Sequence, residues 1–80
     1  MPGTNTIFMF LGFDRNERGD AVPVSQSQQA ESEADAIESA EELAGSHAGA
    51  VAWRRDVMAA IGEMGEPVII FRRGLVGDFN

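Results

Sequence analysis

The chain has 80 residues, enough for one small domain with a thin core, because a chain of this length buries only roughly 60–65% of its unfolded surface. Its 13 acidic and 6 basic residues give a formal net charge of −7, which argues against direct binding to nucleic acid or to an anionic membrane. The absence of cysteine excludes disulfides, thiolate metal sites and cysteine nucleophiles. We therefore expect a single domain over residues 1–80, with no cofactor.

An apolar run at residues 7–13 predicts a strand over residues 5–13 with two apolar faces. No Lys or Arg precedes the run and no small-residue cleavage site follows it, so it does not match a secretory signal. It is also far too short to span a bilayer. We expect a buried strand in a cytoplasmic protein.

The polar residues 14–20 predict a turn, after which residues 21–24 can return as a short strand. Pro23 lacks an N–H group, so this strand must lie at a sheet edge. Residues 25–29 are expected to be a polar link.

A helix is predicted over residues 33–48. Ser32 and Asp35 have the spacing of a capping box, and Gly49 is a suitable C-terminal stop. The residues that share one face of this helix are Ala36, Ile37, Ala40, Leu43, Ala44 and His47.

Two further strands are predicted, at residues 50–55 and 67–72. The connection 56–66 is long for a hairpin, and residues 57–61 within it can form a helical turn. Residues 74–80 are expected to be a loosely held tail.

These elements predict an α+β fold in β(β)αββ order, with three to four antiparallel strands and one amphipathic helix on one face. The strand 67–72 is the most apolar, so we expect it at the centre of the sheet, between strands 5–13 and 50–55.

A single helix leaves the second face of this sheet without cover, although the strands are apolar on both faces. Either the connection 56–66 folds over that face, or a second copy or a partner protein covers it. In the latter case Phe8, Phe10 or Phe71 would be the centre of a hot spot or of a homodimer seam.

Six of the 13 acidic residues lie in or beside the helix. Glu31, Asp35, Glu38 and Glu42 are spaced four, three and four residues apart and form one stripe, called here the acidic stripe, opposite the apolar face. Such charge runs usually form a solvated face. The functional alternative is that the stripe binds a basic surface of a partner.

The remaining polar residues do not assemble a catalytic or metal site. The pairs Arg54-Arg55 and Arg72-Arg73 would lie roughly 15–20 Å apart on antiparallel strands and could not share one phosphate. In each pair, alternation sends one Arg to the helix side and one away. His47 is the only histidine, and we expect it to pack on the apolar helix face without a metal. The residues therefore indicate a non-enzymatic protein.

The second half of the chain resembles a known group of proteins. It combines the run from Ala40 to Ala44, a His-Ala-Gly sequence at 47–49 leading into an apolar strand with Trp53, and Gly-Glu-Pro at 65–67 before another apolar strand. This pattern resembles short proteins of alphaproteobacteria and their prophages. In its size and acidity the chain also resembles small phage-borne anti-CRISPR proteins, including inhibitors of type I-C surveillance complexes. The resemblance implies a phage-encoded inhibitor in the host cytoplasm.

Two functions are therefore expected. The first is an anti-CRISPR-like inhibitor that binds a host CRISPR surveillance complex and blocks its DNA site with the acidic stripe. The second is a small acidic interaction or regulatory domain, a monomer or weak homodimer that uses the open sheet face. Secondary candidate residues for an interface are Phe8, Phe10, Phe71, Arg54 and Arg72.

Overall fold

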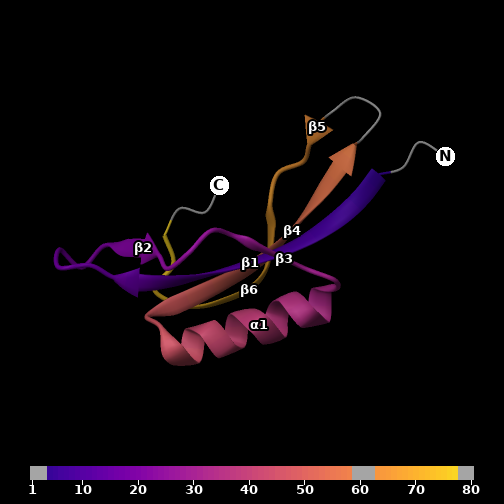
Figure 1. Ribbon diagram of the computed structural model, residues 1–80. Helices are drawn as coiled ribbons and strands as arrows, with labels where there is room; N and C mark the ends of the chain where they lie inside the picture. Colours follow the sequence, from indigo (N-terminus) through magenta and orange to yellow (C-terminus); the bar gives the residue numbers. More distant parts are fainter. Residues whose placement is uncertain (1–3, 59–62, 78–80) are drawn as a thin grey trace.

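In the computed structural model, which describes residues 4–58 and 63–77, the chain is an α+β fold with one helix against one face of an antiparallel sheet (Figure 1). The predicted fold class is confirmed. The elements in chain order are β1 (Thr4–Arg15), β2 (Ala21–Pro23), β3 (Gln28–Ala30), α1 (Glu33–Ser46), β4 (Gly49–Met58), β5 (Glu63–Met64) and β6 (Val68–Gly74).

The sheet is built around β1 and β4, which pair antiparallel from Thr4↔Met58 to Phe13↔Gly49. The short strands β2 and β3 both pair with the other edge of β1, and β5 and β6 both pair with the other edge of β4. The six strands therefore make a sheet four positions wide, in agreement with the predicted three to four strands. All of these pairings are antiparallel, as predicted.

The prediction that the strand 67–72 lies at the centre is wrong, because β4 takes that place and β6 lies at the edge. Residues 50–53 of β4 are buried, whereas Val68 and Ile69 of β6 are each 47% exposed. The small alanines of β4 allow the helix to pack closely against it. This packing determines which strand is central, whereas the number of large apolar side chains in a strand does not.

The first half of the chain contains one strand more than predicted. The strand 5–13 is confirmed and continues to Arg15, and the edge strand at residues 21–24 is confirmed as β2. The polar link predicted at residues 25–29 is only partly correct, because β3 pairs there with residues 8–10 of β1. Gln28 and Gln29 are exposed, so β3 forms through its backbone and leaves no hydrophobic pattern in the sequence.

The connection between β4 and β6 extends the sheet. The helical turn predicted at residues 57–61 is wrong for residues 57–58, which belong to β4, and residues 59–62 lie outside the described part. β5 pairs with the end of β4, and the N–H of Gly65 donates to the carbonyl of Asp56 at 2.7 Å. The described part of this connection therefore lies in the plane of the sheet and does not cover its second face.

The helix begins as predicted and ends earlier. The hydroxyl of Ser32 accepts a hydrogen bond from the N–H of Asp35 at 3.1 Å, as expected of an N-cap. The last helical residue is Ser46, and His47 is the C-cap, with its N–H donating to the carbonyl of Leu43 at 2.8 Å. Gly49 is therefore not the helix stop that the sequence predicted, but the first residue of β4.

The helix and the sheet meet through small side chains. Ala36 and Ala40 of α1 and Ala50 and Ala52 of β4 are fully buried in one cluster. Because alanine side chains are short, the helix lies close to β4, and larger side chains fill the space on either side of this contact. The flanking apolar side chains from the strands are Phe8, Phe10, Ala30, Ile70 and Phe71.

The opposite face of the sheet has its own core, formed by Leu11, Phe13, Val51 and Trp53. Ala21 of β2 and Val76 of the C-terminal segment pack against this cluster. The N–H of Leu75 donates to the carbonyl of Ala48 at 3.0 Å, which holds the segment in place. The prediction of a loose tail is therefore wrong for residues 74–77, and residues 78–80 lie outside the described part.

Candidate functional site: the outer face of the helix

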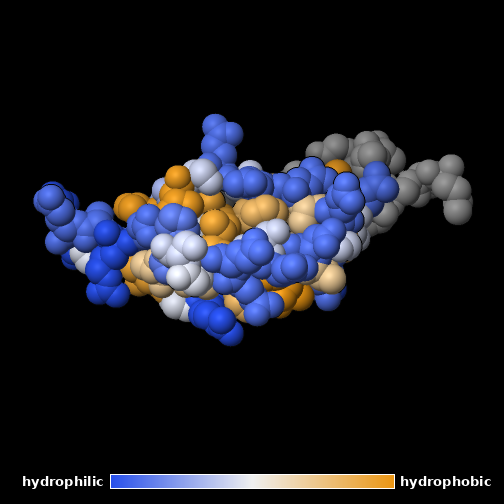
Figure 2. All heavy atoms as spheres, turned by 60° about the horizontal axis from the view of Figure 1, so that its bottom comes forward, coloured by the Kyte–Doolittle hydropathy of each residue, from blue (hydrophilic) through white to orange (hydrophobic). Residues whose placement is uncertain are grey.

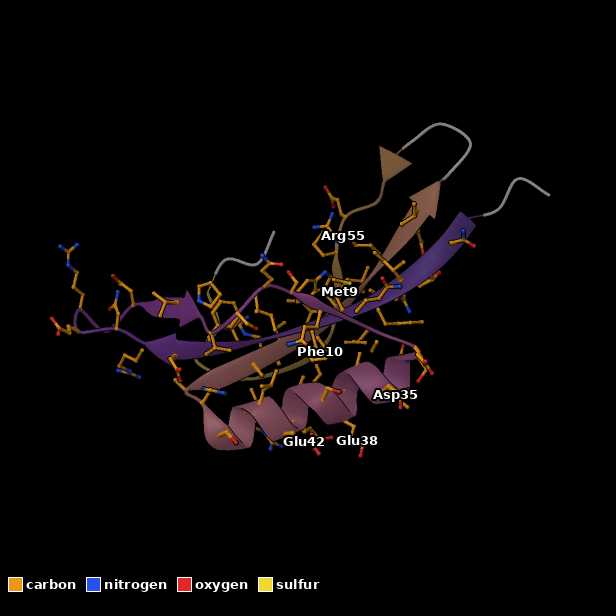
Figure 3. The ribbon with its side chains drawn as sticks, viewed as in Figure 1. Met9, Phe10, Asp35, Glu38, Glu42 and Arg55 are labelled. Carbon is orange, nitrogen blue, oxygen red and sulfur yellow. The ribbon has the colours of Figure 1, made fainter. Side chains whose placement is uncertain are left out.

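The acidic stripe lies on the side of α1 that faces away from the sheet. Figure 3 shows Asp35, Glu38 and Glu42 pointing outward from the helix. Glu31 comes just before the N-cap and lies outside the helix, so the helical period alone does not place it on the same face. All four residues are exposed. Figure 2, in which the helix side comes forward, shows hydrophilic residues over much of this surface, with apolar residues between them.

The acidic stripe has no ion-pair partner in the part of the chain that the structure describes. Across residues 4–58 and 63–77, none of its four carboxylates forms an ion pair with another described residue. The last turn of the helix contains no basic residue. The helix does form one ion pair with the sheet, in which Glu33 lies 3.9 Å from Arg54. Both side chains are about half exposed, so this pair contributes little to stability.

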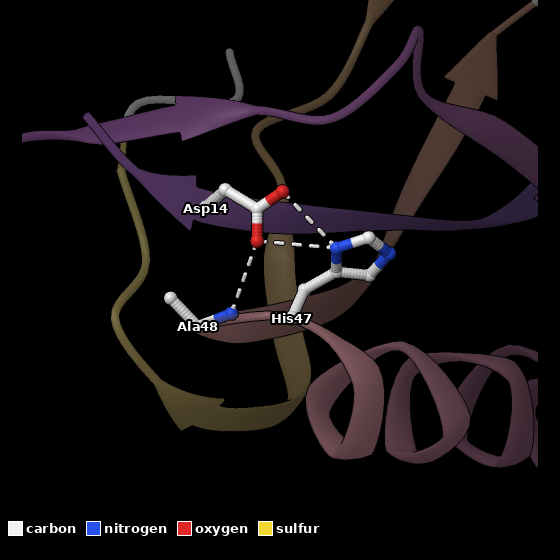
Figure 4. A network of polar contacts seen from close by, with 3 residues as sticks. All are labelled: Asp14, His47 and Ala48. Atoms are coloured by element: carbon white, nitrogen blue, oxygen red, sulfur yellow. Dashed lines mark hydrogen bonds and ion pairs between the residues drawn. The ribbon is translucent and has the colours of Figure 1, made fainter.

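Asp14 and His47 fix the C-terminal end of the helix to the sheet (Figure 4). The Nδ1 atom of His47 lies 3.1 Å from both carboxylate oxygens of Asp14. The same carboxylate accepts a longer contact of 3.4 Å from the N–H of Ala48. His47 is thus half-buried beyond the helix end, and the prediction that it packs on the apolar helix face is wrong.

Sequence reasoning missed Asp14, because it lies 33 residues from His47 and was assigned to a turn. Only the register of β1 with β4, which places the end of β1 beside the start of β4, brings the two together. No local spacing indicates this contact.

The three phenylalanines proposed for an open face lie on the other side of the sheet. Phe8, Phe10 and Phe71 are partly buried and pack with the alanine cluster under the helix. Figure 3 shows Phe10 between the sheet and α1, whereas Met9 lies on the opposite side. The prediction that these phenylalanines lie at the centre of the uncovered face is therefore wrong.

The arginine pairs are separated, as predicted. Arg54 lies on the helix side and pairs with Glu33, whereas Arg72 is paired in register with Val51 and faces the opposite side. The guanidinium of Arg73 lies 5.6 Å above the ring of Phe71. From the register, the two pairs lie about 13 Å apart along the sheet, somewhat less than expected. They do not converge on one anion.

The described residues contain no enclosed pocket and no group of three or more acidic or histidine side chains that could hold a metal ion. No helix in this part of the chain is long and apolar enough to cross a membrane. No protein-family model, no curated protein and no solved structure matches the chain. The outer face of α1, a helical surface of exposed carboxylates, is the strongest candidate site.

Proposed function

We propose that the chain is a non-enzymatic binding protein that presents its acidic stripe to a basic, nucleic-acid-binding surface of a partner protein. The observation that carries this proposal is the exposed stripe without ion pairs to described residues. Glu33, outside the stripe, makes the helix's ion pair to the sheet. A carboxylate that is already held in an ion pair must give up that pair before it can bind a partner. The stripe carboxylates are exposed and have no such pair with a described residue, so binding does not carry this cost.

The density of charge suits such a surface. Within the helix, the stripe residues Asp35, Glu38 and Glu42 span about 11 Å at a rise of ~1.5 Å per residue. This gives about one charge per 5 Å, of the same order as the spacing of ~3.4 Å along one DNA strand. A groove lined with Arg and Lys for a phosphate backbone would therefore meet a similar line of negative charge on this helix.

The helix is also held in place before binding. Its N-terminus is capped by Ser32, its C-terminus is held through Asp14, and its inner face packs on alanines of β4. A preorganised surface loses less conformational freedom on binding than a mobile acidic segment does. Within the setting implied by the resemblance, the partner is a host CRISPR surveillance complex, and the inhibitor competes with its DNA.

The test compares two charge-reversal variants that change the net charge equally. E38K/E42K reverses two residues of the stripe, and E17K/D20K reverses two exposed acids in the turn after β1. Each variant is titrated against a purified type I-C surveillance complex in competition with its target DNA, at low and moderate salt. We expect E38K/E42K alone to lose inhibition and salt sensitivity.

Two results would contradict the proposal. Equal losses in both variants would mean that net charge, rather than the stripe, is responsible. Unchanged inhibition by E38K/E42K would exclude the stripe as the binding surface.

A further inference from the structure

The outer edge of β6 is the most exposed apolar part of the described chain. Val68 and Ile69 are each 47% exposed, and Val22 follows at 37%. No strand among residues 4–58 and 63–77 pairs with this edge. β6 has seven residues, whereas the other strands that pair only on one side, β2, β3 and β5, have two or three. Exposed apolar edges of this length are templates for pairing with another strand.

We propose that β6 pairs antiparallel with β6 of a second copy and joins the two sheets into one. The charges at the ends of the strand favour a second copy in this orientation. Glu66 precedes β6, and Arg72 and Arg73 lie near its end. Antiparallel self-pairing brings Glu66 of each copy beside the arginines of the other, whereas parallel pairing would place like charges together.

The remaining edges explain why this association closes as a dimer. At the opposite edge of the sheet, β2 and β3 have three residues each and β2 ends in Pro23. The described strands also leave residues 4–7 of β1 unpaired there, but this stretch is shorter than β6 and contains the polar Asn5 and Thr6. A molecule with one adhesive edge forms a two-fold pair and cannot extend into a filament.

A bulge in β6 shapes the interface. The register with β4 shifts between Ala52 and Trp53, which leaves Ile70 as an extra residue. Ile70 and Phe71 consequently both pack on the helix side. Val68 and Ile69 remain exposed at the start of the strand, beside Glu66. We infer that this stretch forms the apolar centre of the interface.

The association is tested by sedimentation equilibrium over a range of micromolar concentrations. We expect a monomer–dimer equilibrium for the natural chain. I69K abolishes the dimer, and I69T, which keeps the preference for strand structure, weakens it. The matched control is V22K, a similar change at the other exposed edge, which leaves the dimer intact. Fluorescence of Trp53, which is buried, confirms folding of each variant.

A charge swap tests the orientation. E66R and R73E each place two symmetry-related pairs of like charges across the interface, which raises the dissociation constant of the dimer by about twofold to thirtyfold. The combination E66R/R73E restores the opposite charges and the dimer. A monomer at all concentrations, or a dimer that survives I69K, would overturn the proposal. Failure of the double variant to recover would overturn the antiparallel arrangement. The variant E38K/E42K stays dimeric, which separates this surface from the acidic stripe.

Discussion

Substitution of Gly49 tests how the C-terminal segment is held. Gly49 and Gly74 are paired at the end of the β4–β6 ladder, where the backbone of Leu75 packs closely against Gly49. A Cβ atom on Gly49 would overlap the backbone N and O atoms of Leu75, and these cannot move as a flexible side chain would. We therefore predict that Gly49→Ala destabilises the fold, although alanine is otherwise the better residue in a strand.

The magnitude follows from the cheapest way to relieve the overlap, which is release of residues 75–77. Release breaks the hydrogen bond from Leu75 to Ala48, a net loss of about 0.5–1.5 kcal/mol. It also exposes the half-buried Val76, at a cost of about 1 kcal/mol. The free energy of unfolding therefore falls by about 1.5–2.5 kcal/mol. For a chain of this size the melting temperature falls by roughly 6–20 °C.

The assay is thermal unfolding followed by the fluorescence of Trp53, the only tryptophan, which is 2% exposed. The control is Gly45→Ala near the end of α1, where an added Cβ meets nothing within 4 Å. This control should stabilise the helix by about 0.5–1 kcal/mol.

A second substitution makes the test specific. Val76→Ala should lower the free energy of unfolding by about 1 kcal/mol in the natural chain. In the Gly49→Ala variant it should lower it by almost nothing, because residues 75–77 are already released in that variant. An equal cost of Val76→Ala in both backgrounds would refute the reasoning, as would an unchanged melting temperature for Gly49→Ala.

Three further substitutions test the helix and its attachments, each by urea unfolding. Ser32→Ala removes the N-cap and should lower the free energy of unfolding by about 1 kcal/mol, whereas Ser32→Asp should retain most of it. Asp14→Ala removes the contacts to His47 and the following N–H, and should cost about 1–2 kcal/mol; a neutral result would mean that the pair does not hold the helix end. Ala40→Leu overfills the contact between helix and sheet and should cost about 1–3 kcal/mol, whereas the same change at the exposed Ala34 should be nearly neutral.

Local patterns predicted the elements that form through local interactions. The helix follows from the Ser32–Asp35 spacing and from one apolar face, and the strand 5–13 follows from its continuous apolar run. The helical part of the acidic stripe, Asp35, Glu38 and Glu42, follows from the same period, because spacings of three and four residues fix a shared face whatever the helix packs against. These features depend on no distant contact.

The order of the strands and the choice of face could not be predicted in this way. Residues 7–11 are apolar on both faces, so no alternation indicates which face meets the helix. That choice depends on the register of β1 with β4, which places Phe10 opposite Ala52 and Met9 opposite Trp53. The alanine side accepts the helix, and the tryptophan side becomes the second core.

The acidic stripe and the β6 edge would act together in a dimer. A two-fold axis perpendicular to the joined sheet keeps both helices on the same face, because such a rotation does not exchange the faces. The dimer would then present two acidic stripes side by side, and a partner with one long basic groove would meet both. Two linked contacts raise the effective affinity when the geometry allows both to form. Ile69→Lys, which leaves every carboxylate of the stripe in place, should then weaken inhibition as well as self-association. If it removes the dimer and leaves inhibition unchanged, each copy binds its partner alone.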